Sequence, residues 1–228
     1  MIITLDGPSG SGKSTIAQML AEKLGYFYLN SGYLYRALGY ILVKHYGYSE
    51  EKLRNPDFAD VEDCLLSGCF VYNYVGGRAT VFFKADITDQ LKQVEVSEYA
   101  SLISRHAEVR EILVEYQRNL AAEKRSMVVE GRDCGSKVFD DARVKFFITA
   151  SSEIRARRLQ KDQEKLGKIL SYEEAYEFVF RRDNRDKTRQ HAPLVQPEGC
   201  VLIDTSDHTP DEILDKMLAI IAAASGSI

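Results

Sequence analysis

The residues whose types and spacing can do chemistry begin near the amino terminus, at Gly7-Pro8-Ser9-Gly10-Ser11-Gly12-Lys13-Ser14-Thr15. They fit the pattern Gly-x-x-x-x-Gly-Lys-Ser/Thr, and they lie between a short apolar run and a helical pattern. Glycines let consecutive backbone N–H groups turn toward a polyphosphate, because no Cβ blocks the approach. The first turn of the following helix adds unpaired N–H groups. The stretch predicts a phosphate-binding loop.

The side chains of this loop favour a nucleoside triphosphate. Lys13 can reach the outer phosphates, and the Ser14 hydroxyl can ligate the Mg²⁺ that accompanies them. A dinucleotide fingerprint does not fit, because its third glycine, counted from Gly10, falls on Thr15. We therefore expect a nucleoside triphosphate and Mg²⁺ at this loop.

A second candidate stretch follows the β-branched run of residues 127–129. It reads Glu130-Gly131-Arg132-Asp133. An acidic residue at the end of a strand can hold a Mg²⁺-bound water, and the Arg–Asp pair offers a ligand both a donor fork and an acceptor. The alternative is an ordinary salt-bridged loop.

Ser31 and Arg36 open a helix directly after an apolar run at residues 26–29. Residues just beyond the carboxyl end of a strand in an open parallel sheet face the ligand crevice. The alternatives are that Ser31 caps the helix and that Arg36 is a solvated charge.

Residues 151–189 hold eleven Lys and Arg against eight Asp and Glu. Within them, Arg182, Arg185 or Asp186, and Arg189 recur at the spacing of one helix face. Such a stripe is usually solvated. In a chain that also carries a phosphate loop, we interpret it as the cations needed by a second anionic group.

The elements that position these residues alternate between strand and helix. Strands are expected at residues 2–5, 26–29, 127–129, 144–149 and 200–204, and helices at 16–24, from 31 to about 46, 60–66, 94–123 in two pieces split near 104–106, from 151, and after Thr209. This order predicts an α/β fold, a doubly wound parallel sheet flanked by helices. The β-rich runs 69–75 and 78–83 flank Gly76-Gly77 and predict a hairpin. We expect one domain, 1–228, with a small β-rich insert at about residues 62–92.

Composition narrows the classes further. The 228-residue chain has a net charge of −4, which does not favour nucleic acid or anionic membranes as partners. No apolar run is long enough to span a membrane, and Met1 leads straight into the first strand, so we expect a cytoplasmic protein. The cysteines at 64, 69, 134 and 200 form no C-x-x-C pair, which favours reduced thiols over zinc or disulfides.

Together these motifs resemble the bacterial cytidylate kinases, P-loop nucleoside monophosphate kinases that phosphorylate CMP and dCMP from ATP. The resemblance covers nearly the whole chain and rests on the phosphate loop, on residues 31–36 and 130–133, and on residues 182–189 running into Ala192-Pro193-Leu194. Departures stand at Cys134, Ser136 and Asp140, which are packing and turn positions that affect the shape of the loop.

The resemblance also implies roles for individual residues. Arg132, Arg36 and Arg189 would bind the acceptor phosphate, with Arg132 and Arg189 catalytic beside Lys13. The remaining implied contacts are cytosine with Ser31, Ser101, Arg110 and Asp133, the sugar with Arg182 and Asp186, and ATP with Arg155, Arg157 and Arg158 on a helical lid of about residues 151–168. The insert would be the monophosphate-binding subdomain.

The expected reaction is Mg·ATP + (d)CMP → ADP + (d)CDP, carried out by a monomer. One alternative is a P-loop kinase for another small acceptor, such as UMP, AMP or shikimate. The other is a nucleotide-switch ATPase or GTPase that acts through protein partners. The chain lacks the Asn-Lys-x-Asp guanine motif, and its clustered arginines suit a second substrate.

Overall fold

The structure, a computed structural model, describes residues 1–66 and 70–226. Cys69, placed by the sequence at the start of a strand, lies outside the described residues. The chain divides into two compact units, each with its own buried apolar residues. The first unit comprises Met1–Leu29 and Leu120–Ile228, and the second comprises Asn30–Asn119.

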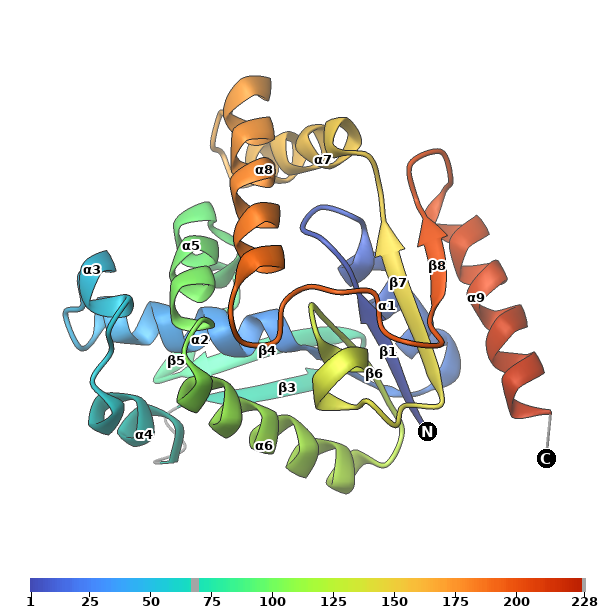
Figure 1. Ribbon diagram of the computed structural model, residues 1–228, viewed down its shortest axis with the longest axis horizontal. Coiled ribbons are helices and arrows are strands. Elements are labelled where there is room, and N and C mark those ends of the chain that lie inside the picture. Colours follow the sequence, from blue (N-terminus) through green and yellow to red (C-terminus); the bar gives the residue numbers. More distant parts are fainter. Residues whose placement is uncertain (67–69, 227–228) are drawn as a thin grey trace. The chain divides into compact units, whose positions relative to one another are not determined.

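The first unit is built on a five-stranded sheet (Figure 1). Its order is β2-β6-β1-β7-β8, formed by Phe27–Asn30, Met127–Gly131, Ile2–Asp6, Val144–Thr149 and Val201–Asp204. Strand β1 pairs in parallel with β6 and β7, and β7 pairs in parallel with β8. The order runs outward in both directions from β1, which confirms the predicted doubly wound α/β fold.

The register of the central strands places two of the candidate stretches side by side. Asp6, the last residue of β1, pairs with Gly131, the last residue of β6. Two strand ends that meet at one edge of a parallel sheet form the usual ligand crevice of such folds. The phosphate loop and the Glu130–Asp133 stretch therefore start from neighbouring points.

Helices α1 (Lys13–Leu24) and α9 (Pro210–Ser225) pack against each other, and α1 also packs against β6. Helix α1 ends at Gly25, which caps it with a left-handed φ of 66°. Helix α9 starts after Thr209, as predicted, and Thr209 forms a capping box with Glu212. Local chemistry thus determines where these two helices begin and end.

Helices α7 (Ser152–Lys165) and α8 (Tyr172–Thr188) pack together after β7 (Figure 1). The turn between them contains Gly167 at φ 74°, and the predicted lid of residues 151–168 covers α7 and the start of this turn. Arg189 was predicted to continue one face of the second helix, but the helix ends at Thr188. Arg189 caps it with an extended backbone, and its side chain is nevertheless buried.

The second unit contains the helices α2, α3, α4, α5 and most of α6, with a three-stranded sheet of order β3-β4-β5. The bounds are Ser31–Lys44 for α2, Glu50–Leu53 for α3, Phe58–Leu66 for α4, Val71–Val75 for β3, Arg78–Phe83 for β4, Ala85–Asp86 for β5, Gln90–Lys92 for the 3-10 turn η1, Val94–Ile103 for α5 and Ala107–Lys124 for α6. The predicted break between two helices near 104–106 is confirmed. Elements α3 and β5 are too short to have had a periodic signal.

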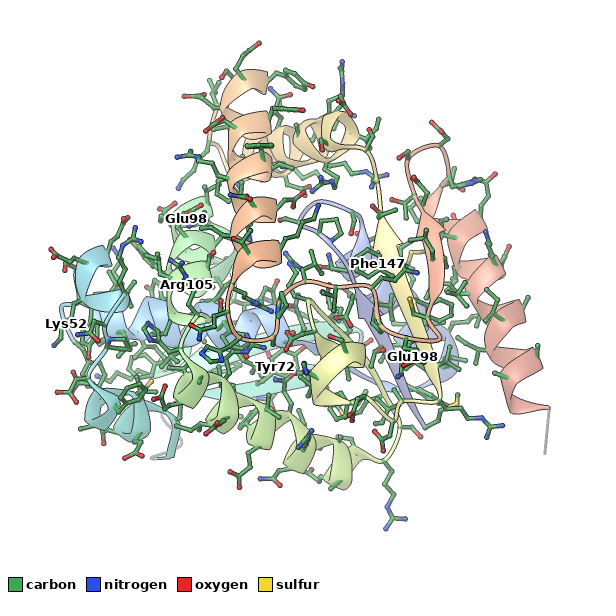
Figure 2. The ribbon with its side chains drawn as sticks, viewed as in Figure 1. Lys52, Tyr72, Glu98, Arg105, Phe147 and Glu198 are labelled. Carbon is green, nitrogen blue, oxygen red and sulfur yellow. The ribbon has the colours of Figure 1, made fainter. Side chains whose placement is uncertain are left out.

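The antiparallel hairpin β3–β4 was predicted from its two glycines. Gly76 and Gly77 both have positive φ, at 58° and 75°, a backbone that glycine adopts without strain. Tyr72 of β3, labelled in Figure 2, accepts a hydrogen bond at its hydroxyl from the backbone N–H of Asn30, at 3.1 Å. This bond ties the hairpin to the start of α2. The insert predicted at residues 62–92 lies within this larger unit.

Two further expectations concern the whole chain. In the described ranges, no helix combines the length and apolar character needed to cross a membrane. Among the described cysteines, Cys64, Cys134 and Cys200 are thiols that form no disulfide with one another.

Candidate active site

The phosphate loop connects β1 to α1 and depends on its glycines. Gly7 has φ 148°, and a Cβ there would lie 1.9 Å from the Ile148 carbonyl oxygen of β7. No side chain fits at that distance, so the neighbouring strand requires glycine. Gly12 precedes α1 with a left-handed φ of 85°, which turns the chain into the helix.

Lys13 lies across the loop rather than in solvent. Its side chain is buried, and Nζ donates to the Pro8 carbonyl oxygen at 2.6 Å and to the Ser11 hydroxyl at 3.2 Å. Burial, followed by the positive charge of Arg132, lowers the pKa of Lys13 to about 7, although Glu130 and nearby aspartates oppose the change. A polyanion beside this amine would favour its protonated form and raise that pKa.

Ser14 and Thr15 are exposed in the first turn of α1. A serine hydroxyl is a hard oxygen ligand of the kind that Mg²⁺ accepts when it also binds substrate phosphates. Ser14 therefore suits the predicted role toward the metal ion of Mg·ATP.

Arg132 and Asp186 form the centre of a largely buried charge cluster. Arg132 Nε donates to Asp186 Oδ2 at 2.8 Å, and Arg182 Nε lies 3.8 Å from the same oxygen. Burial alone would lower the pKa of Arg132, but the charge and the hydrogen bond of Asp186 raise it above its ordinary value. Burial would raise the pKa of Asp186, yet the arginines, Arg132 foremost, hold it below its ordinary value. Both groups are therefore charged at neutral pH.

Arg189 and Asp133 form a second buried pair. Arg189 Nη2 donates to Asp133 Oδ1 at 3.3 Å, while its Nε donates to the Ala192 carbonyl oxygen at 2.6 Å. The fold thus brings together residues from two separate sequence stretches, 130–133 and 182–189. The predicted cationic face is a paired, buried cluster in this unit and not a solvated stripe.

The three arginines predicted to contact ATP have different surroundings. Arg155 is buried among protein acceptors. Arg157 is exposed, with its guanidinium carbon 5.5 Å from the centre of the Tyr172 ring. Arg158 donates to the Thr205 hydroxyl at 2.8 Å and to the Thr205 carbonyl oxygen at 2.7 Å. The Thr205 hydroxyl in turn donates to the Ser11 carbonyl oxygen of the phosphate loop at 2.8 Å.

Asp6 is a residue that the sequence reasoning did not single out. Its fully buried carboxylate accepts from the backbone N–H groups of Cys134 at 2.8 Å and Gly135 at 2.7 Å, in the π-helical turn η2 (Cys134–Val138). Burial raises the pKa of Asp6 to about 6, against the effect of these hydrogen bonds and with a contribution from Asp133. The sequence offered one signal for Asp6, namely a charged residue at the end of a buried strand, directly before the phosphate loop.

Glu130 also has a partner that the sequence did not indicate. The Tyr28 hydroxyl of β2 donates to Glu130 Oε1 at 2.6 Å, and both side chains are buried. This bond holds the carboxylate at the end of β6, within electrostatic reach of Lys13.

Four predicted substrate residues lie in the second unit. Ser31 and Arg36 are on α2, Ser101 is on α5 and Arg110 is on α6, and α2 packs against α5. Ser31 is not the helix cap, because the Asn30 side chain accepts from the Tyr33 N–H at 3.2 Å and fills that role.

The two arginines of this unit are held by backbone carbonyls. Arg36 Nη1 donates to the Leu91 carbonyl oxygen at 3.0 Å, and Arg110 Nη1 donates to that of Ser104 at 3.2 Å. Arg110 is buried, with its guanidinium carbon 5.4 Å from the centre of the Tyr35 ring. Both side chains are thereby oriented within the unit.

Comparison with known proteins gives concordant results. A sequence model of the family described as cytidylate kinase matches residues 3–223. The chain is 38% identical over 219 residues to a cytidylate kinase of Caldanaerobacter subterraneus, covering 96% of this chain and 93% of that protein. It is 40% identical over 225 residues to a cytidylate kinase of Chlamydia caviae, covering 97% and 98%.

Among solved structures, an uncharacterized protein from Eubacterium ventriosum shares the fold with a TM-score of 0.53 and 14% identity, covering 98% of each chain. The family match spans the phosphate loop, both charge clusters and all four predicted residues of the second unit. The chain belongs to the cytidylate kinase family.

Proposed function

We propose that this protein transfers the γ-phosphoryl group of Mg·ATP to CMP or dCMP, producing ADP and CDP or dCDP. The observation that carries the proposal is the pair of buried arginine–aspartate clusters beside the phosphate loop. Arg132 and Asp186 contribute one cluster and Arg189 and Asp133 the other, in a chain of the cytidylate kinase family. A binding loop for one nucleotide explains Lys13 but not these additional buried cations.

On the donor side, the loop from Gly7 to Thr15 binds the phosphates of ATP through its backbone N–H groups. Lys13 supplies positive charge to the outer phosphates, and Ser14 binds the Mg²⁺ that arrives with the nucleotide. In phosphoryl transfer the protein does little covalent chemistry, so placement and charge neutralisation account for most of the rate.

On the acceptor side, Arg132, Arg189 and Arg36 bind the phosphate of CMP. In the first unit three arginines, at 132, 182 and 189, lie in ion pairs with two aspartates, at 133 and 186, so the fold gathers guanidinium groups of the kind that bind phosphate. The acceptor phosphate is already an anionic nucleophile, so no residue has to act as a general base. The arginines orient it and neutralise the charge that the transfer brings together.

The base and sugar contacts follow the family pattern. Asp133 accepts a hydrogen bond from the cytosine amino group, and Arg110 donates to the acceptor edge of the base. Ser31 and Ser101 complete the contacts with the base, and Arg182 and Asp186 bind the sugar. We further propose that residues 62–92 form the monophosphate-binding subdomain and that residues 151–168 close over ATP. The proposed enzyme is a cytoplasmic monomer.

The test is an acceptor panel in a coupled assay of ADP release, with CMP, dCMP, UMP, AMP, shikimate and no acceptor. We expect kcat/KM to be highest for CMP or dCMP and ADP release to be negligible without an acceptor. A higher kcat/KM for one of the other acceptors would identify that acceptor, and not CMP or dCMP, as the substrate. Rapid ATP hydrolysis without an acceptor, stimulated by a protein, would instead support a nucleotide switch.

A further inference from the structure

Arg155, on the first turns of α7, uses all five of its N–H donors inside the protein. Nε donates to the Ala150 carbonyl oxygen at 3.0 Å, and Nη1 donates to the Ser9 carbonyl oxygen at 3.1 Å. The fork formed by Nη1 and Nη2 binds both carboxylate oxygens of Asp183, at 3.0 and 2.6 Å, and Nη2 also donates to the Ser152 hydroxyl at 3.1 Å. An arginine has five such donors, so each of them has an acceptor.

These acceptors belong to three segments whose relative positions matter for the proposed reaction. Ser9 is in the phosphate loop, Ala150 and Ser152 flank the junction of β7 with α7, and Asp183 is on α8. Helix α8 also carries Asp186, the partner of Arg132. One guanidinium therefore connects the ATP-binding loop to the helix that anchors the acceptor-side charges.

The backbone around Arg155 fits closely against the same loop. A Cβ added at Gly10 would lie 3.0 Å from the Arg155 carbonyl oxygen and 3.1 Å from its Cβ. The side chain of Arg155 is 5% exposed and that of Asp183 is 13% exposed, so water competes little for their bidentate pair. Arg157, two residues along α7, is exposed instead.

We propose that Arg155 is a positioning residue that acts through Asp183 and the Ser9 carbonyl, and that it does not contact ATP. A phosphate could gain a hydrogen bond from this guanidinium only if one of the present acceptors lost its own. Asp183 thereby helps to position the phosphate loop, although it makes no predicted contact with either substrate. The inference rests on the proposed function for the role of this arrangement in catalysis, but the way Arg155 and Asp183 hold the phosphate loop can be measured independently.

The first experiment compares Arg155→Lys, Asp183→Asn and the double variant with the parent, with Arg181→Gln as the control. Arg181 is an exposed arginine on α8, paired with Glu177 at 3.3 Å, and its substitution should change nothing. We expect each single variant to lose at least about tenfold in kcat with a KM for ATP within about threefold of the parent. The double variant should lose no more than the worse single variant, because both substitutions break one unit.

A direct contact with ATP predicts a different pattern. Arg155→Lys would then raise the KM for ATP, Asp183→Asn would retain the parental kcat, and the losses would multiply in the double variant. That pattern would overturn the proposal. Melting temperatures show that each variant is folded at the assay temperature, and a purely structural role would lower the melting temperature without changing kcat of the folded enzyme.

Hydrogen exchange provides a readout that needs neither catalysis nor a folded Arg155→Lys. Asp183→Asn preserves the size of the side chain while removing the carboxylate, and it should accelerate amide exchange in peptides covering residues 7–12, although residue 183 lies on another element. Unchanged exchange in that loop would refute the positioning role. If the parent fails to phosphorylate CMP, the proposed function fails, while the exchange result still decides whether Arg155 and Asp183 hold the loop.

Discussion

Asp6→Asn tests how the fold holds the acceptor-binding stretch. The carboxylate is fully buried and accepts two backbone hydrogen bonds, from Cys134 and Gly135. These residues directly follow Arg132 and Asp133. The asparagine oxygen can accept from one of the two N–H groups, but the amide nitrogen faces the other donor. The unpaired donor contributes about 1–3 kcal/mol of destabilisation to the variant, and this contribution does not change with pH because asparagine does not titrate.

The larger prediction concerns the pH dependence of stability. Burial raises the pKa of Asp6 from 3.8 to about 6 in the folded protein. A difference of roughly two pH units corresponds to about 3 kcal/mol in the free energy of unfolding. Because the folded pKa lies above the unfolded one, this stabilisation is complete only below the unfolded pKa and is lost as the pH rises through about 6.

The assay is urea unfolding of both proteins at several values between about pH 4.5 and pH 7.5. Over that window the parent should lose about 2 kcal/mol relative to Asp6→Asn, since asparagine does not titrate and the other groups cancel in the difference. Two unfolding free energies that change in parallel with pH would refute the raised pKa of Asp6. An activity unaffected by Asp6→Asn would refute its role in placing Arg132 and Asp133.

Three further predictions concern the proposed chemistry. Lys13→Met should lower kcat on the order of 10³-fold or more with an unchanged circular dichroism spectrum, since a charge stabiliser is removed. In the parent, whose Lys13 has a pKa of about 7, ATP binding at pH 8 should take up protons, and calorimetry in buffers of different ionisation enthalpy should show an uptake that is absent in Lys13→Met. Near-normal turnover by folded Lys13→Met would show that Lys13 is not a catalytic residue. The parent should favour CMP over UMP in kcat/KM by at least about 10²-fold. Asp133→Asn should narrow this ratio, mainly by losing activity with CMP, because the asparagine amide can donate to the uracil carbonyl. An unchanged ratio would exclude Asp133 from recognising the base. Amide exchange in residues 151–168 should slow when a bisubstrate analogue binds, and tight binding without that change would refute a closing lid.

Features that depend only on residues close together in the sequence could be predicted from it. The phosphate loop follows from glycine, lysine and serine at fixed spacing, and its glycines do adopt the unusual backbone that the pattern requires. The hairpin at Gly76-Gly77 and the start of α9 at Thr209 likewise follow from turn and cap chemistry within a few residues. The alternation of apolar runs with helical patterns was sufficient to predict the doubly wound sheet, because the central strands β1 and β6 are buried on both faces and read as continuous apolar runs.

The partners of the charged residues were decided by the tertiary structure. Asp6 and Gly135 are 129 positions apart and meet only because β1 and β6 are neighbours in the sheet. Arg155 belongs to the same basic stretch as Arg157, yet the packing of α7 against α8 and the phosphate loop buries one while the other stays exposed. Helical spacing shows that charges share a face, but it contains no information about what packs against that face. That contact determines whether an arginine remains in water, holds a carboxylate or supports a loop.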